Sequence, residues 1–116
     1  MIKYSKTDDN ILALTIKGGY DDYELQEVHA LMEEKLHQFS TLRMYLEITE
    51  TADTEHAFKD LGLHMDLLKD FDRTALVTDA EAPASLAEHG DPLFACPIQG
   101  YSLQEREKAK AWISQN

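Results

Sequence analysis

Two rows of histidine and acidic residues are the first groups in this sequence that could do chemistry. The rows are His56, Asp60 and His64, and His29, Glu33 and His37. Residues four positions apart share one face of a helix, so each row could chelate a metal ion or form a carboxylate–histidine pair. Neither row supplies the usual outer ligands of a metal site. We therefore expect Asp60 and His64 to form a hydrogen-bonded pair, the row from His29 to face solvent, and neither row to bind a metal.

Carboxylates and hydroxyls gather near the predicted carboxyl ends of parallel strands, the edge at which open α/β sheets keep their sites. The set comprises Asp21, Asp22, Glu50, Asp53, Thr54, Thr78 and Asp79. Oxygen ligands of this kind would suit a cation-dependent phosphoacceptor domain, which is the rival interpretation from a different functional class. Against it, the acids lie in loops more than at strand ends, and no lysine follows the last strand.

Nucleophilic catalysis has less support. No serine lies in a glycine-flanked elbow. Cys96 is the only cysteine, which excludes an internal disulfide, and it sits in an apolar stretch before Pro97 where it would be inert core. The pair Gly18–Gly19 stands alone and does not make a phosphate-binding loop. We therefore expect no catalytic residue, no cofactor and no enzymatic activity.

The composition is that of one small acidic domain. The chain has 116 residues, with 22 Asp and Glu against 11 Lys and Arg and a formal net charge of -11. This length suits a single domain over residues 1–116. The charge repels nucleic-acid backbones and anionic headgroups, and no apolar run is long enough for a signal peptide or a membrane span. We expect a soluble cytoplasmic protein with no nucleic-acid partner and no integral membrane segment.

The apolar pattern predicts alternating strands and helices in the order ββαβαβαβα. The predicted strands cover residues 2–5, 11–16, 42–48, 73–78 and 93–98, and the predicted helices cover 23–39, 54–71, the stretch between Pro83 and Gly90, and 102–113. Helices between strands imply parallel crossovers. The fold class is therefore α/β: a mostly parallel five-stranded sheet with an antiparallel first strand at one edge and four helices.

The predicted helix over residues 54–71 is apolar over too much of its circumference to pack on a sheet alone. Its apolar residues are Ala57, Phe58, Leu61, Leu63, Met65, Leu67, Leu68 and Phe71. At about 100° per residue they cover roughly 220°. The surplus surface must meet a neighbouring helix, a second subunit or an apolar ligand. We expect this face to be one wall of a ligand cavity or a subunit interface. The expected wall residues are Phe58, Leu61, His64, Met65 and Leu68.

Four stretches carry local patterns that go with this order of elements. They are Gly-Gly-Tyr-Asp-Asp-Tyr at 18–23, the buried strand at 42–48, Phe-Asp-Arg-Thr-Ala-Leu-Val-Thr-Asp at 71–79, and Glu-Lys-Ala-Lys-Ala-Trp-Ile at 107–113. Together with the element order, they resemble the SpoIIAA-like family of STAS/SEC14-type domains over essentially the whole chain. The resemblance implies a non-enzymatic binding or regulatory domain.

One branch of that family consists of anti-sigma-factor antagonists, which are switched by phosphorylation of a hydroxyl residue at the start of the helix after the buried strand. The corresponding stretch here, residues 53–57, lacks the second hydroxyl and the glycine of that pattern. We therefore expect Thr54 to be a helix N-cap.

The chain looks closer to the branch grouped with lipid-binding SEC14-type domains. That resemblance implies an apolar, lipid-like ligand held between sheet and helices. A protein-interaction module without the phospho-switch is the alternative, with a protein partner or a homodimer in place of the ligand.

Overall fold

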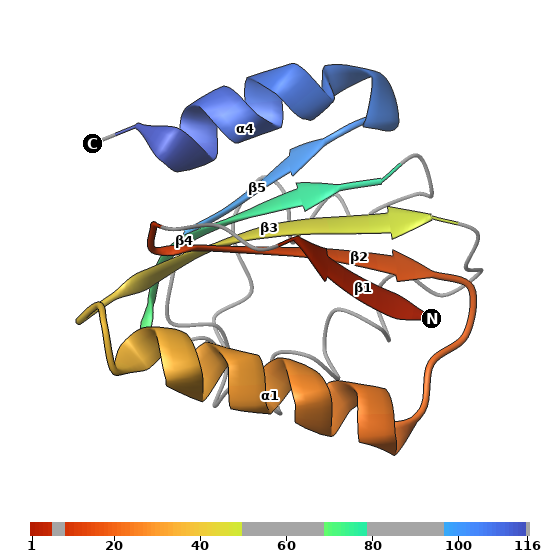
Figure 1. The fold of residues 1–116 in the computed structure, drawn as a ribbon. Helices are drawn as coiled ribbons and strands as arrows, with labels where there is room; N and C mark the ends of the chain where they lie inside the picture. The colour runs from red at the N-terminus through yellow and green to blue at the C-terminus, as the bar shows by residue number, and fades with distance from the viewer. Residues whose placement is uncertain (6–8, 50–68, 79–96, 116) are drawn as a thin grey trace.

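A five-stranded sheet forms the centre of the protein (Figure 1). The computed structural model describes residues 1–5, 9–49, 69–78 and 97–115. The strands are β1 (Ile2–Ser5), β2 (Ile11–Lys17), β3 (Leu42–Thr49), β4 (Phe71–Val77) and β5 (Ile98–Tyr101). They lie side by side in chain order, with β1 antiparallel to β2 and every other neighbouring pair parallel. The predicted mostly parallel sheet with an antiparallel first strand is confirmed.

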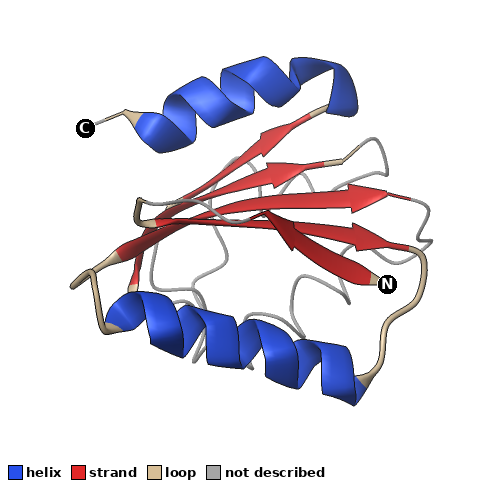
Figure 2. Ribbon diagram, viewed as in Figure 1, coloured by secondary structure: helices blue, strands red, loops and turns tan. Residues whose placement is uncertain are grey.

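Helices lie on both faces of this sheet (Figure 2). Helix α1 (Asp22–Leu36) lies on one face, and α4 (Arg106–Ser114) lies on the other after a short 3-10 turn, η2 (Leu103–Glu105). Two of the four predicted helices are therefore present in the described residues. The other two, at 54–71 and between Pro83 and Gly90, lie almost wholly outside those residues.

The predicted end of the helix over residues 54–71 is wrong. Lys69 and Asp70 form a turn, and Phe71 is the first residue of β4, where it pairs with Leu42 of β3. Phe71 is only 5% exposed. An apolar residue at this position satisfies both a helical period and the start of a buried strand, so periodicity alone could not separate the two.

The described part of the last strand extends past residue 98, the end that we predict for it, to Tyr101. Pro97 has no N–H group to donate to a ladder, and its carbonyl accepts a hydrogen bond from the Thr74 N–H at 2.9 Å. Pairing with β4 begins at Ile98 and continues to Tyr101. The described part of this strand therefore begins at Ile98, the first residue after Pro97 with an N–H group to donate. Residues 93–96 lie outside the described residues.

The ends of the elements near α1 follow from individual side chains. Gly18 ends β2 with a φ of 69°, a left-handed conformation that favours glycine. Asp21 is the N-cap of α1, and its side chain accepts a hydrogen bond from the Glu24 N–H at 2.9 Å. Helix α1 therefore begins at Asp22, one residue before the predicted start at residue 23, and it ends at Leu36, three residues before the predicted end at 39.

Two apolar layers hold the helices on the sheet. Alternate residues of the central strands point to opposite faces, so each strand contributes to both layers. The α1 side buries Leu12, Leu14, Ile16, Met44, Leu46, Ile48 and Leu76 against Leu25, Val28 and Met32 of α1. The α4 side buries Tyr45, Ala75 and Val77 against Ala109 and Ile113. The layer under α1 is the larger of the two and contains most of the buried apolar residues that the structure describes.

Replacing Leu46 with alanine should cost about 2–5 kcal/mol of unfolding free energy, because this side chain is 0% exposed at the centre of the sheet. That cost is a large part of the total stability of a small domain. Urea denaturation followed by circular dichroism measures it. The matched control is Tyr23→Ala, at a residue that is 68% exposed, which should stay within about 0.5 kcal/mol of wild type. Equal losses in the two variants would show that Leu46 does not lie in the core.

Candidate functional site

Most of the side chains that the sequence singles out for binding or chemistry lie outside the described residues. This holds for the proposed wall residues Phe58, Leu61, His64, Met65 and Leu68, and also for Glu50, Asp53, Thr54, His56, Asp60, Asp79 and Cys96. Their roles stay predictions.

The groups from those patterns that the structure does describe have structural roles. His29 Nε2 lies 3.3 Å from Glu33 Oε1 on the exposed side of α1, and the His37 N–H closes that helix by donating to the Glu33 carbonyl. Asp21 caps α1. Thr78 is buried just after β4, and its N–H donates to the Tyr101 carbonyl at 2.9 Å. Within the described ranges, no three His, Cys, Asp or Glu side chains lie close enough together to hold a metal ion.

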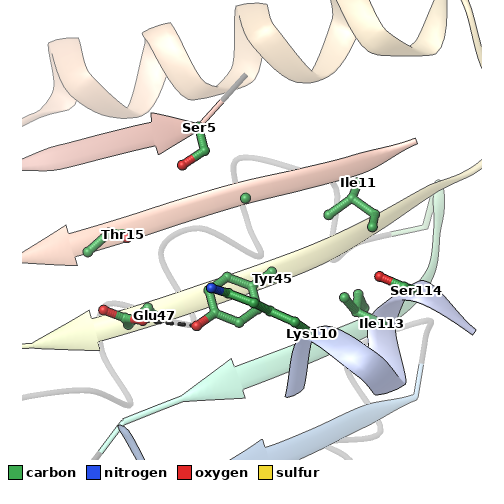
Figure 3. Close-up of a pocket in the computed structure, with 9 residues that line it drawn as sticks. Ser5, Ile11, Thr15, Tyr45, Glu47, Lys110, Ile113 and Ser114 are labelled. Atoms are coloured by element: carbon green, nitrogen blue, oxygen red, sulfur yellow. Dashed lines mark hydrogen bonds between the residues drawn. The ribbon is translucent and has the colours of Figure 1, made fainter. Parts of the chain in front are cut away.

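A groove on the α4 side of the sheet contains a polar cluster that the sequence analysis did not find (Figure 3). It encloses about 410 Å³. Its lining residues come from three strands and from α4: Ser5, Ile11, Ala13, Thr15, Tyr45, Glu47, Lys110, Ile113 and Ser114. Figure 3 shows Lys110 reaching from α4 across Tyr45, with Glu47 beside it on β3.

Glu47 is the centre of this cluster. Its Oε1 accepts hydrogen bonds from Arg106 Nε at 2.8 Å and from the Tyr45 hydroxyl at 2.9 Å. Its Oε2 accepts from Arg106 Nη2 at 3.2 Å. The two arginine bonds form the parallel fork that gives arginine–carboxylate pairs their strength and direction. The Lys110 ammonium lies 5.9 Å from the centre of the Tyr45 ring, within range of a cation–π contact.

These contacts fix the protonation states of both acidic groups. Burial by itself raises the pKa of Glu47, but the hydrogen bonds from Arg106 and Tyr45 and the nearby positive charges outweigh it and lower the pKa below its ordinary value. Burial, together with the hydrogen bond to Glu47, raises the pKa of Tyr45 well above its ordinary range. Near neutral pH the carboxylate therefore stays charged and the phenol stays protonated.

The same helix is held at its other end by two arginines from the sheet. Arg43 Nη1 donates to the Ile113 carbonyl at 3.1 Å, and Arg73 Nη1 donates to the Trp112 carbonyl at 3.0 Å. The Arg73 guanidinium also lies 5.3 Å from the centre of the Trp112 ring. Cations at a helix C-terminus compensate the free carbonyls and the negative end of the helix dipole. The Arg106–Glu47 ion pair therefore holds the start of α4, and hydrogen bonds from Arg43 and Arg73 hold its end, which fixes one side of the groove.

A sequence signal for this cluster exists, but it is weak. Arg43, Tyr45 and Glu47 alternate along the strand and must share one face of the sheet, while Arg106 and Lys110 are four apart and share one face of a helix. Most residues at 42–48 are apolar, as in a strand that is covered on both faces, so Arg43 and Glu47 do not stand out as part of a polar cluster. The sequence does not show that these two faces meet.

The arrangement defines the class of domain. It is an α/β domain with a mixed five-stranded sheet, an antiparallel strand at one edge and a helix on each face. Among the helices of the described residues, none has the length and apolar character needed to cross a bilayer.

The chain belongs to the SpoIIAA-like family. The family model described as SpoIIAA-like matches residues 11–114, which is nearly the whole chain. No curated protein and no solved structure matches. The resemblance inferred from the sequence is confirmed at the level of the family.

Replacing Glu47 with glutamine should destabilise the protein at neutral pH by about 1 kcal/mol, because the fork to the half-exposed Arg106 and the bond from Tyr45 lose their charge. The folded pKa lies below the ordinary value of 4.5, so this contribution is present above that pH and is lost as the pH falls through the folded pKa.

Urea midpoints measured from pH 7 to pH 3 test this expectation. The difference between wild type and Glu47→Gln should be largest above pH 5 and should shrink below about pH 4.5. The control, Glu34→Gln on the exposed side of α1, should show little difference at any pH. A Glu47→Gln effect that is equally large at pH 3 and pH 7 would contradict a charge-dependent pairing.

Proposed function

We propose that this SpoIIAA-like chain is a non-enzymatic binding or regulatory domain that holds an apolar, lipid-like ligand. The observation that supports the non-enzymatic part is the complete pairing of Glu47. This carboxylate accepts three hydrogen bonds from described residues: two come from Arg106, and the third is donated by the Tyr45 hydroxyl.

A catalytic acid or base works best when its pKa lies near the working pH and its proton can reach a substrate. The pKa of Glu47 is lowered and that of Tyr45 is raised, so the two values move away from neutrality in opposite directions. Their oxygen atoms are also engaged with each other and with Arg106. The cluster is therefore suited to holding α4 and orienting a bound group, and poorly suited to proton transfer.

The ligand part of the proposal is supported by the sequence of the predicted helix over residues 54–71. Phe71 belongs to β4 and not to this predicted helix, but the apolar arc of the helix keeps its width without Phe71. At about 100° per residue, Leu63 lies at one edge of the arc and Phe58 at the other. The arc still covers roughly 220°, about twice what one packed face needs. An apolar ligand would cover the surplus, with Phe58, Leu61, Met65 and Leu68 against its chain and His64 beside its polar end.

Replacing Met65 with glutamate tests the ligand directly. We expect wild-type protein to take up a fluorescent fatty acid such as dansyl-undecanoic acid and Met65→Glu to abolish the uptake, because a charge in an apolar wall is costly unless it is paired. Native mass spectrometry of freshly purified protein would show any co-purified lipid and the subunit count in the same spectrum. The control, Tyr23→Glu, makes the same change of charge at an exposed residue and should keep full uptake.

The other outcomes of this experiment are distinct. A Met65→Glu protein that stays folded, with unchanged uptake and unchanged mass, would contradict the proposed wall. Conversion of a dimer to a monomer without any loss of uptake would support the alternative, a protein-interaction module whose apolar face is a subunit interface.

A further inference from the structure

Among the elements that the structure describes, α4 covers only part of its side of the sheet. Helix α4 packs over β3, β4 and β5. On this face β2 presents every second residue from Ile11 to Lys17, and β1 lies beside it at the edge of the sheet. The pairing register places Lys3, Thr15 and Glu47 in one row across the three strands, and Ser5, Ala13 and Tyr45 in the next. These rows form an open sheet face beside α4.

The open face is hollowed along its length. The groove of about 410 Å³ is continued by a second hollow of about 640 Å³, and the two share Ser5, Thr15 and Glu47. The second hollow is lined by Lys3, Tyr4, Ser5, Thr15, Lys17, Glu47, Thr49 and Leu103. We call the combined feature the β2 trough. The seven residues of β2 are separated by six rises of about 3.3 Å, which gives the trough a length of roughly 20 Å, and the small side chain of Ala13 keeps its floor low.

The charge of the trough is opposite to that of the whole chain. Among the described residues, three lysines line it, Lys3, Lys17 and Lys110, together with one carboxylate, Glu47, which is paired with Arg106. Lys110 also lies 3.8 Å from Glu107, but both side chains are mostly exposed, at 56% and 92%, so that pair is weak. The protein as a whole carries a formal charge of -11. A basic trough on an acidic protein attracts negative charge to this one place.

The geometry points to an occupant. We propose that the β2 trough binds an extended acidic segment of a partner protein, with alternate side chains directed to the floor and to the lysines. A length of roughly 20 Å suits about six residues of extended chain, and the hydroxyls of Ser5, Thr15 and Ser114 offer hydrogen bonds to a peptide backbone. Ile11, Ala13 and Ile113 provide apolar contacts between the charges. Nucleic acid fits less well, because the rest of the surface would repel its backbone.

The proposal does not depend on residues 58–68 or on an apolar ligand, so it can fail or succeed separately from the proposed function. The probe is a fluorescein-labelled peptide of alternating glutamate and valine, followed by fluorescence anisotropy at low ionic strength. Wild-type protein should bind it saturably, and the same peptide with glutamine in place of glutamate should bind at least about tenfold more weakly, because it lacks the charges that the lysines attract. No saturable binding of the acidic peptide to wild type would overturn the proposal.

Charge-reversal variants locate the binding. Lys3→Glu/Lys110→Glu should weaken the affinity about tenfold or more, since two attractive contacts become repulsive. The matched control, Lys69→Glu/Lys108→Glu, makes the same change of net charge at exposed lysines that do not line the trough, and it should stay within about twofold of wild type. Equal losses in the two double variants would mean that only net charge matters, which would overturn the proposal.

Two further measurements keep the proposal testable if a variant folds poorly. Ala13→Trp places a large side chain on the floor of the trough without changing the charge, so it should also weaken binding of the acidic peptide. Unchanged binding would contradict a binding site in the trough. Amide NMR of wild-type protein should show peptide-induced shifts on β2 and α4 and none on α1, and shifts confined to α1 would overturn the assignment.

The same variants distinguish other occupants. A dimer that depends on Lys3 and Lys110, seen by sedimentation of the chain alone, would assign the trough to a second copy and overturn the peptide proposal. Co-sedimentation with phosphatidylserine vesicles that depends on the same lysines, without peptide binding, would overturn it in favour of a membrane surface.

Discussion

The attachment of α4 to the sheet by arginine pairs at its two ends is the interaction on which this face of the protein depends. Arg106 joins the start of the helix to Glu47 on β3, and Arg43 and Arg73 hold the last carbonyls from β3 and β4. A helix of nine residues is marginal by itself in water. The Arg106–Glu47 ion pair, the hydrogen bonds from Arg43 and Arg73, and the small apolar layer around Ile113 together fix the position of the helix, and with it one edge of the β2 trough.

This attachment links stability to recognition. Glu47 lies in the strand that forms one wall of the trough, and the same carboxylate holds α4. Because Arg106 cancels the charge of Glu47, the lysines around it dominate the local field. A partly buried carboxylate without that partner would cost stability and would repel an acidic ligand. The same pair thus stabilises the helix and sets the sign of the surface beside it.

The strands and α1 could be predicted because their signals are local: alternation in β2 and β3, an acidic cap at Asp21, and a glycine where β2 ends. The sequence places Phe71 in a helix because an apolar residue at this position fits a helical period as well as the start of a buried strand. The predicted end of the last strand comes too early, because the apolar run stops at Ile98 while the hydrogen bonds with β4 continue to Tyr101. The Glu47 cluster could not be predicted, because Glu47 and Arg106 are 59 residues apart in the chain and only the packing of α4 brings them together.

The order of the strands has one more consequence. Open α/β sheets form their ligand crevices where the strand order reverses, because the connections on either side of that point leave the sheet in opposite directions. The five strands that the structure describes follow the chain order without a reversal. The order of these five strands therefore gives no crevice of that kind at their carboxyl ends, whereas the β2 trough lies laterally, between α4 and the part of the sheet beside it.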